Sequence, residues 1–179
     1  MEASDAELLD AWRGGDRGAG DALFSRHFDA VYRFFERRVH GDVSDLVQRT
    51  FLGLTEARDR LRGEASVRTV LYVIARRELH AFYAQGRRGA AIDFGVSSVA
   101  DLAPSPSSIV RGHDERALLG EALRRIPVDL QLVMELHYWE SMAGPEIARV
   151  LEIPEGTVRS RLRRALEALR ERLVELSGS

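Results

Sequence analysis

The sequence predicts an all-α protein, built as two small helical domains joined by a flexible linker. Apolar residues recur every three to four positions in several segments, and no segment alternates apolar and polar residues as a strand does. A stretch that contains glycines, prolines and serines interrupts the helical pattern near the middle of the chain. We place the domains at residues 1–88 and 114–179 and the linker at residues 89–113.

The first two helices are expected at residues 6–13 and 22–39. The second has the spacing of an amphipathic helix. Its inward face would hold Phe24, Phe28, Val31, Phe35 and Val39. Glycines mark a break between the two helices, namely Gly14, Gly15, Gly18 and Gly20. No predicted strand leads into these glycines, so we do not expect a dinucleotide-binding loop.

Two further helices complete the first domain. Ser44 is placed to cap the third helix. The apolar set of that helix is Leu46, Val47, Phe51 and Leu54. The fourth helix is expected at residues 66–85. Its inward side chains would be Leu71, Ile74, Leu79 and Phe82.

The linker is not wholly polar. It holds Pro104, Pro106 and a cluster of serines, as linkers commonly do. Apolar side chains interrupt it, namely Ile92, Phe94, Val96, Val99, Leu102, Ile109 and Val110. We therefore expect a segment that is mobile alone yet docks on another part of the protein.

Four helices are expected in the second domain, at residues 116–126, 128–139, 146–151 and 154–176. The last two have the layout of a helix-turn-helix, in which a small residue lets the helices approach each other. The apolar set of this motif is Ile147, Ala148, Leu151, Ile153, Val158 and Leu162. Pro154 suits a first helical turn, because its missing N–H has no intrahelical partner there.

The last helix begins with an arginine-rich stretch, PEGTVRSRLRRA. At about 100° per residue, one sector of this helix is apolar. That sector holds Val158, Leu162, Ala165, Leu166, Leu169 and Leu173. The side chains on or beside the opposite face are Thr157, Ser160, Arg163 and Arg164. Arg159 and Arg161 lie nearer the two borders of the apolar sector.

This division of side chains predicts how the helix would meet DNA. If its N-terminal turns enter a major groove, Ser160, Arg163 and Arg164 are aimed at base edges. Arg159 and Arg161, with the helix N-terminus, are better placed for phosphates or groove walls. Exposed arginines are also common on solvated helix faces, but the complete helix-turn-helix favours DNA.

Charge and composition limit the classes of function. The formal net charge of −2 argues against a globally basic nucleic-acid binder, whereas residues 159–164 hold four arginines and no acid. All 26 basic residues are arginine, which is typical of GC-rich codon usage. Cysteine is absent, which fits a reducing cytoplasm. There is no apolar run long enough for membrane insertion and no secretory signal pattern, so we expect a cytoplasmic protein.

An enzyme is the least favoured class. The five histidines are scattered, and they do not form a recognised metal-binding or catalytic spacing. We therefore expect no catalytic residues, no metal and no cofactor.

The whole chain resembles the bacterial RNA polymerase sigma factors of the sigma-70 family, extracytoplasmic-function (ECF) type. In the C-terminal half, EIA followed by IPEGTVRSRL resembles sigma region 4, which recognises the −35 promoter element. In the N-terminal half, GDRGAGDALFSRHFDAVY, DLVQRTF and RGEASVRTVLYVIARRELHAF resemble region 2. Two matched domains occur in the order that the family has, joined by a linker of suitable length.

The resemblance implies roles for residues of the first domain. The helix that family members dock on the clamp coiled coil of the polymerase β′ subunit would present Asp45, Leu46, Val47, Gln48, Arg49 and Phe51. The loop that captures a flipped −10 base would be Arg62, Gly63, Glu64, Ala65 and Ser66. The separated strand would be held by Arg68, Thr69, Arg76, Arg77, His80 and Tyr83. Arg87 and Arg88 would grip upstream phosphates.

Several positions depart from the family pattern. Val70 stands where many members have tryptophan, and Arg77 where asparagine is frequent. Arg49 replaces a common glutamate in the docking helix. Glu152 replaces a glycine in the turn of the helix-turn-helix, and a left-handed backbone there would cost free energy.

The resemblance implies an alternative sigma factor, which binds core RNA polymerase and directs transcription initiation. Its partners would be core polymerase, through the β′ clamp coiled coil and the β flap, promoter DNA in duplex and single-stranded form, and an anti-sigma factor. The alternative is a stand-alone helix-turn-helix regulator, which would bind DNA without directing core polymerase.

Overall fold

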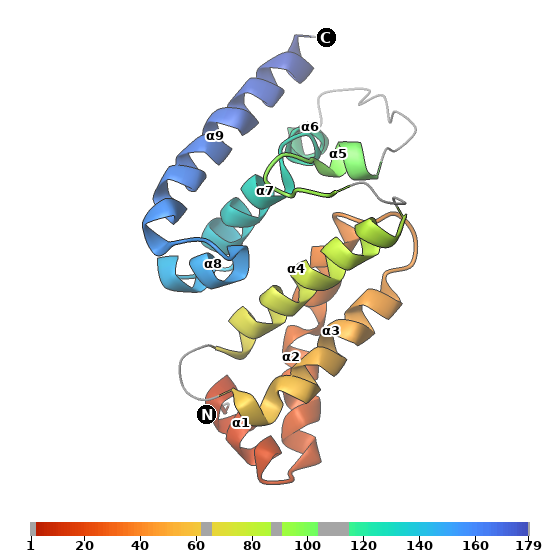
Figure 1. The fold of residues 1–179 in the computed structure, drawn as a ribbon, viewed down its shortest axis with the longest axis vertical. Helices are drawn as coiled ribbons and strands as arrows, with labels where there is room; N and C mark the ends of the chain where they lie inside the picture. Colours follow the sequence, from red (N-terminus) through yellow and green to blue (C-terminus); the bar gives the residue numbers. More distant parts are fainter. Residues whose placement is uncertain (1–2, 62–65, 87–90, 104–114, 179) are drawn as a thin grey trace. The chain divides into compact units, whose positions relative to one another are not determined.

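The computed structural model describes residues 3–61, 66–86, 91–103 and 115–178. Within these residues the regular structure is helical, and the β-type pairing there is a single bridge between Ser98 and Pro127. The chain forms two compact units, Met1–Phe82 and Tyr83–Ser179 (Figure 1). The predicted all-α fold with two domains is confirmed. In the described part of the chain, no helix is long and apolar enough to cross a membrane.

The first unit is built from α1 (Asp5–Arg13), α2 (Arg17–Glu36), α3 (Ser44–Ala57), a short 3-10 turn (Arg58–Arg60) and most of α4 (Val67–Gly86) (Figure 1). Apolar side chains from each of the four helices meet in its core. The buried set includes Leu9, Leu23, Phe34, Phe35, Leu54, Leu71 and Leu79. The ring of Phe34 on α2 meets that of Tyr72 on α4 edge-on, with centroids 5.9 Å apart.

Helix α2 begins earlier than the glycine pattern predicts. Asp16 caps it by accepting a hydrogen bond from the backbone N–H of Ala19, at 3.2 Å, so Gly18 and Gly20 lie inside the helix. Gly20 is needed for packing: a Cβ placed on it would lie 2.7 Å from Nε1 of the buried Trp12. The expected break is therefore confined to the turn at Gly14 and Gly15, where Gly15 has a φ of 100°.

The carboxylate of Asp5 on α1 contacts two side chains of α2. Asp5 Oδ1 accepts a hydrogen bond from Arg26 Nη1 at 2.7 Å, and its Oδ2 lies 2.6 Å from His27 Nε2. Burial alone would raise the pKa of Asp5, but the hydrogen bond from Arg26 and the charge of His27 hold this pKa below its ordinary value.

The start of α3 differs in detail from the expectation. Ser44 is the first residue of the helix, and Val43, at the capping position, makes no side-chain hydrogen bond to the helix. The carboxylate of Asp42 instead accepts hydrogen bonds from the backbone N–H and the hydroxyl of Ser44. These two bonds lower the pKa of Asp42.

The second unit contains α5 (Val99–Leu102), α6 (Glu115–Arg124), α7 (Val128–Met134), a π-helical turn (Glu135–Trp139), α8 (Gly144–Leu151) and α9 (Glu155–Ser177) (Figure 1). Its core is formed mainly by Ala122, Ile126, Val128, Leu132, Leu136, Ile147 and Ala165. The helix expected at residues 128–139 thus widens into a π turn after Met134. That turn ends at Trp139, whose side chain is 53% exposed.

Part of the expected linker is folded onto the second unit. Residues 93–103, here called the strap, bury Phe94, Val99 and Leu102, so the expected docking is observed. Val96, in the same segment, is instead 73% exposed. Residues 104–113 of the expected linker, with Ile109 and Val110, lie outside the described residues.

Candidate nucleic-acid interface and docking groove

The helix-turn-helix is formed by α8, a tight turn and α9. Helix α8 starts at Gly144-Pro145, where the carboxylate of Glu146 accepts a hydrogen bond from the backbone N–H of Ala143 at 3.0 Å. It ends at Leu151 and is followed by Glu152, whose φ of 56° and ψ of 45° are left-handed. The turn closes where the N–H of Ile153 donates to the carbonyl of Ala148, at 3.0 Å. The left-handed conformation considered for Glu152 is therefore present.

The inner face of α9 follows the expected helical spacing closely. Val158, Ala165 and Leu169 are buried, and Leu162 is half-buried. Leu166 was expected in the same sector but is exposed, and by helical angle it lies at the border of that sector. One side of α9 is thus fixed against the unit, and the opposite side faces solvent.

The outward face of the first turns of α9 is polar and basic. Arg159, Ser160, Arg163 and Arg164 are exposed, and Thr157 is half-buried. The Ser160 hydroxyl donates to the carbonyl of Thr157 at 2.9 Å. Arg163 approaches Glu167 only at 4.0 Å, one helical turn away, so this exposed pair restrains its side chain weakly.

Arg161 differs from the other arginines of this helix. Its side chain is 23% exposed and turns back against the protein, where its Nη1 donates to Asp129 Oδ2 at 3.2 Å. Asp129 lies in the first turn of α7 and is buried. In this structure the guanidinium of Arg161 therefore joins α9 to α7.

The residues expected to hold single-stranded DNA differ in exposure along α4. Arg77 and His80 are exposed, and Arg68 and Arg76 are half-buried. Ser66 caps the helix by accepting from the N–H of Thr69 at 3.1 Å. The described part of α4 thus presents a discontinuous basic surface.

Two members of the expected strand-binding set are buried, and others are not described. Thr69 is buried, with its Oγ1 2.9 Å from Ser66 Oγ, and Tyr83 is buried as well. Phe82, expected inside, is 41% exposed, and Tyr72 is buried. Outside the described residues lie Arg62, Gly63, Glu64, Ala65, Arg87 and Arg88.

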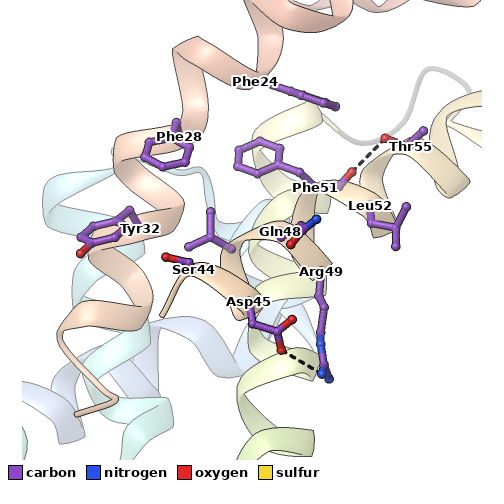
Figure 2. A pocket seen from close by; sticks show the side chains of 11 residues that line it. Phe24, Phe28, Tyr32, Ser44, Asp45, Gln48, Arg49, Phe51, Leu52 and Thr55 are labelled. Carbon is purple, nitrogen blue, oxygen red and sulfur yellow. Dashed lines mark hydrogen bonds and ion pairs between the residues drawn. The ribbon is translucent and has the colours of Figure 1, made fainter. Parts of the chain in front are cut away.

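A groove of about 690 Å³ lies between α2 and α3. Figure 2 shows aromatic side chains of α2 on one side and side chains of α3 on the other. The lining consists of Phe24, Phe28, Tyr32, Ser44, Asp45, Val47, Gln48, Arg49, Phe51, Leu52 and Thr55. The rings of Phe28 and Tyr32 stack with centroids 6.1 Å apart, which makes the α2 side broad and apolar.

Charged groups lie at one edge of this groove. Asp45 and Arg49, one turn apart on α3, form an exposed ion pair with Arg49 Nη2 2.8 Å from Asp45 Oδ2 (Figure 2). Gln48 is exposed beside them. The groove thus combines an apolar floor with a rim that carries both signs of charge and an amide.

The structure brings most of the predicted docking residues together in this groove. Five of the six line it, whereas Leu46 is buried and is not part of the lining. Sequence reasoning missed the α2 side. Phe24, Phe28 and Tyr32 follow one another at intervals of four residues; Phe24 and Phe28 were expected on the inward face, and Tyr32 was given no role. Phe28 is 47% exposed, so that expectation was wrong.

Comparisons with known proteins match both halves of the chain. The family described as "Sigma-70 region 2" matches residues 23–89, and "Sigma-70, region 4" matches residues 116–169. An ECF RNA polymerase sigma-E factor of Salmonella typhimurium is 32% identical over 178 residues, which cover 94% of this chain and 93% of that protein. The sigma-E factor of Haemophilus influenzae is 27% identical over 185 residues, with 98% of each chain covered.

A solved structure has a similar fold. It is the sigma factor RpoE of Bartonella quintana in complex with the anti-sigma factor NepR. The likeness has a TM-score of 0.62 and covers 86% of this chain and 95% of that chain, at 21% identity.

Proposed function

Because the chain belongs to the ECF-type sigma factors of the sigma-70 family, we propose that it recognises −35 and −10 promoter elements and opens the duplex for core RNA polymerase. It is an alternative sigma factor that directs transcription. Sigma factors are initiation factors and are not enzymes by themselves. In this proposal region 2 spans residues 1–88 and region 4 residues 114–179, with the linker between them.

The observation that carries the proposal is the arrangement of α8 and α9. Buried Val158 and Ala165 fix α9 on its inner side, so that Arg163 and Arg164 project into solvent from its N-terminal half. A helix presented in this way can enter a major groove, where an arginine donates two hydrogen bonds to a guanine. We assign −35 base contacts to Ser160, Arg163 and Arg164.

The backbone contacts are assigned to neighbouring groups. Arg159 is exposed at the border of the apolar sector and suits a phosphate. Thr157 lies in the first turn of α9, beside helix N–H groups that attract anions. Arg161 can reach a phosphate only by giving up its contact with Asp129.

The −10 element is assigned to α4 and the residues before it. Exposed Arg77 and His80 support contacts with a separated strand through charge and stacking. Thr69 and Tyr83 are buried in this chain, so a contact from either would require a local rearrangement. Promoter opening would draw on the binding of unpaired bases and would need no metal or nucleotide cofactor.

The groove between α2 and α3 is assigned to the clamp coiled coil of the polymerase β′ subunit. An apolar floor of Phe28, Phe51 and Leu52 suits the apolar face of an amphipathic helix. The pair Asp45–Arg49 and the amide of Gln48 can exchange partners with charged side chains of that helix. We further propose contacts of region 4 with the β flap, and an anti-sigma factor, since RpoE of Bartonella quintana was solved with one.

Reconstituted transcription tests this function. The purified chain should capture core polymerase and direct transcription from some members of a library randomised at −35 and −10. Permanganate reactivity of thymines near −10 should rise only when chain and core are both present. A chain that binds DNA unaided but cannot direct core polymerase would instead be a stand-alone helix-turn-helix regulator.

A further inference from the structure

We propose that the strap, residues 93–103, positions the DNA-reading helix α9 through α7, and thereby sets how sharply the protein discriminates −35 sequences. This inference rests on the proposed −35 recognition by α9. It gives the folded half of the linker a part in DNA reading, in addition to joining the domains.

The strap caps α7. The first N–H groups of a helix have no intrahelical partner, and Pro127, at the capping position, makes no side-chain hydrogen bond to them. Two carbonyls of the strap take that place. The N–H of Val128 donates to Ser97 at 3.0 Å, and the N–H of Asp129 donates to Phe94 at 2.9 Å. Val128 and Asp129 are buried while the strap is docked, and loss of the strap would remove the protein partners of both N–H donors.

The strap is itself a folded element. Ser98 and Asp101 form a capping box at the start of α5, with the Ser98 hydroxyl donating to Asp101 at 2.6 Å. Phe94, Val99 and Leu102 are buried, which favours the docked state through loss of apolar surface to water. At its far end, Arg124 Nη2 donates to the carbonyl of Ala103 at 3.0 Å.

The capped turn of α7 in turn holds α9. Asp129 donates its backbone N–H to Phe94 and accepts, through Oδ2, from Arg161 Nη1 at 3.2 Å. One buried residue therefore contacts both the strap and the DNA-reading helix. While the strap is docked, Arg161 is kept against the protein. When the strap leaves, the first turn of α7 loses its cap, so Asp129 holds Arg161 less firmly and Arg161 can exchange its carboxylate partner for a phosphate.

The expected consequence is a change in how strongly the protein distinguishes −35 sequences, more than a change in its overall affinity for DNA. A freed arginine adds contacts to every DNA sequence, because phosphates carry no sequence information. A less firmly held α9 weakens the base contacts that require a fixed geometry. Both effects lower the ratio of matched to scrambled −35 activity.

The experiment uses the full chain with core polymerase on two templates that differ only in a matched or scrambled −35 element. Phe94→Ala removes the main apolar anchor of the strap, and Val96→Ala is the matched control because Val96 lies on the exposed side of the same segment. We expect Phe94→Ala to reduce the matched-to-scrambled ratio about tenfold, the size of one lost base-specific contact. Val96→Ala should leave the ratio unchanged.

A second pair of variants tests the link through Asp129 without removing an apolar side chain. Asp129→Asn should lower the same ratio and increase the salt dependence of binding to scrambled DNA, since Arg161 is freed. Asp129→Glu should restore most of the ratio, because it keeps the carboxylate. Hydrogen exchange at the amides of Val128 and Asp129 should accelerate in Phe94→Ala and not in Val96→Ala.

The outcomes separate this inference from the proposed function. If wild-type protein does not distinguish the two templates, −35 recognition by this chain fails. If wild type does distinguish them, while Phe94→Ala keeps the wild-type ratio, the strap has no part in positioning and the inference is overturned, whatever the result for Asp129→Asn. A Phe94→Ala protein that unfolds is replaced by Phe94→Leu, which is compared with the same Val96→Ala control.

Discussion

The rings of Phe28 on α2 and Phe51 on α3 lie nearly parallel, with centroids 6.4 Å apart and planes inclined by 8°. Phe51 is buried, whereas Phe28 is almost half exposed. The two rings thus form a continuous apolar surface from the core to the open side of the groove. Aromatic side chains, phenylalanine included, are enriched in the buried core of protein interfaces.

Phe28→Ala should weaken capture of core polymerase by about tenfold or more, because a central aromatic anchor is lost. The free energy of unfolding should fall by only about 1–2 kcal/mol, since the ring is partly exposed already. Phe82→Ala is the matched control, as Phe82 is similarly exposed on α4 and does not line the groove. Pull-down of core polymerase in the absence of DNA measures the effect. If the two variants capture core polymerase equally well, the groove is not the docking site.

Arg163→Ala or Arg164→Ala should each reduce −35 discrimination by about 1–3 kcal/mol, if the arginine donates two hydrogen bonds to a base. Arg159→Ala should weaken promoter use with little change in sequence preference, because phosphate contacts carry no sequence information. Arg170→Ala, also exposed but farther along α9, serves as the control. Transcription from templates with matched and scrambled −35 elements gives the ratios. Unchanged ratios for both Arg163 and Arg164 variants would reject the assignment.

Glu152→Gly should stabilise the protein by about 0.5–1 kcal/mol, because a left-handed backbone is strained for a residue with a Cβ and free for glycine. Glu140→Gly is the matched control: Glu140 also ends a helical turn, but its φ is −95°. That substitution should destabilise the protein by a similar amount. Thermal unfolding of the full chain measures both. A lower melting temperature for Glu152→Gly than for wild type would contradict the expected relief of strain.

Asp5→Asn should destabilise the first unit at neutral pH and lose this effect in acid. The pKa of Asp5 in the folded protein lies below its ordinary value of 3.8. Its stabilising effect is therefore complete above about pH 3.8 and disappears as the pH falls through the lowered folded pKa. The melting temperatures of wild type and Asp5→Asn should converge over that interval. Asp21→Asn, at an exposed site on α2, should not show this pattern. A difference in melting temperature between wild type and Asp5→Asn that stays constant down to the lowest pH would exclude the ionised carboxylate as its cause.

The elements that were predicted well have local causes. Gly144-Pro145 and Pro154 mark the starts of α8 and α9, and the apolar partners of the motif lie within a few turns of one another. The left-handed conformation considered for Glu152 came from the family pattern, which has a glycine in this turn. Local sequence suffices here because each determinant acts on its own neighbours.

The features that were missed depend on distant contacts. Gly20 was assigned to a break, but it lies inside α2, where Trp12 of another helix packs on it. Phe28 has the helical spacing of a core residue, but side chains with this spacing can also line an exposed groove, as Phe28 does. The backbone carbonyls of Phe94 and Ser97 cap a helix that follows much later in the chain. Every residue has such a carbonyl, so the sequence does not indicate which ones act as caps.

The two tryptophans give each unit its own optical reporter. Trp12 is buried in the first unit, and Trp139 is mostly open to solvent in the second. A buried indole emits at shorter wavelength and is shielded from collisional quenchers such as acrylamide, whereas an open one is not. A partner that covers the π turn of the second unit should therefore change the emission of Trp139. A partner that binds only the groove of the first unit should leave that emission unchanged, so no added label is needed to distinguish the two.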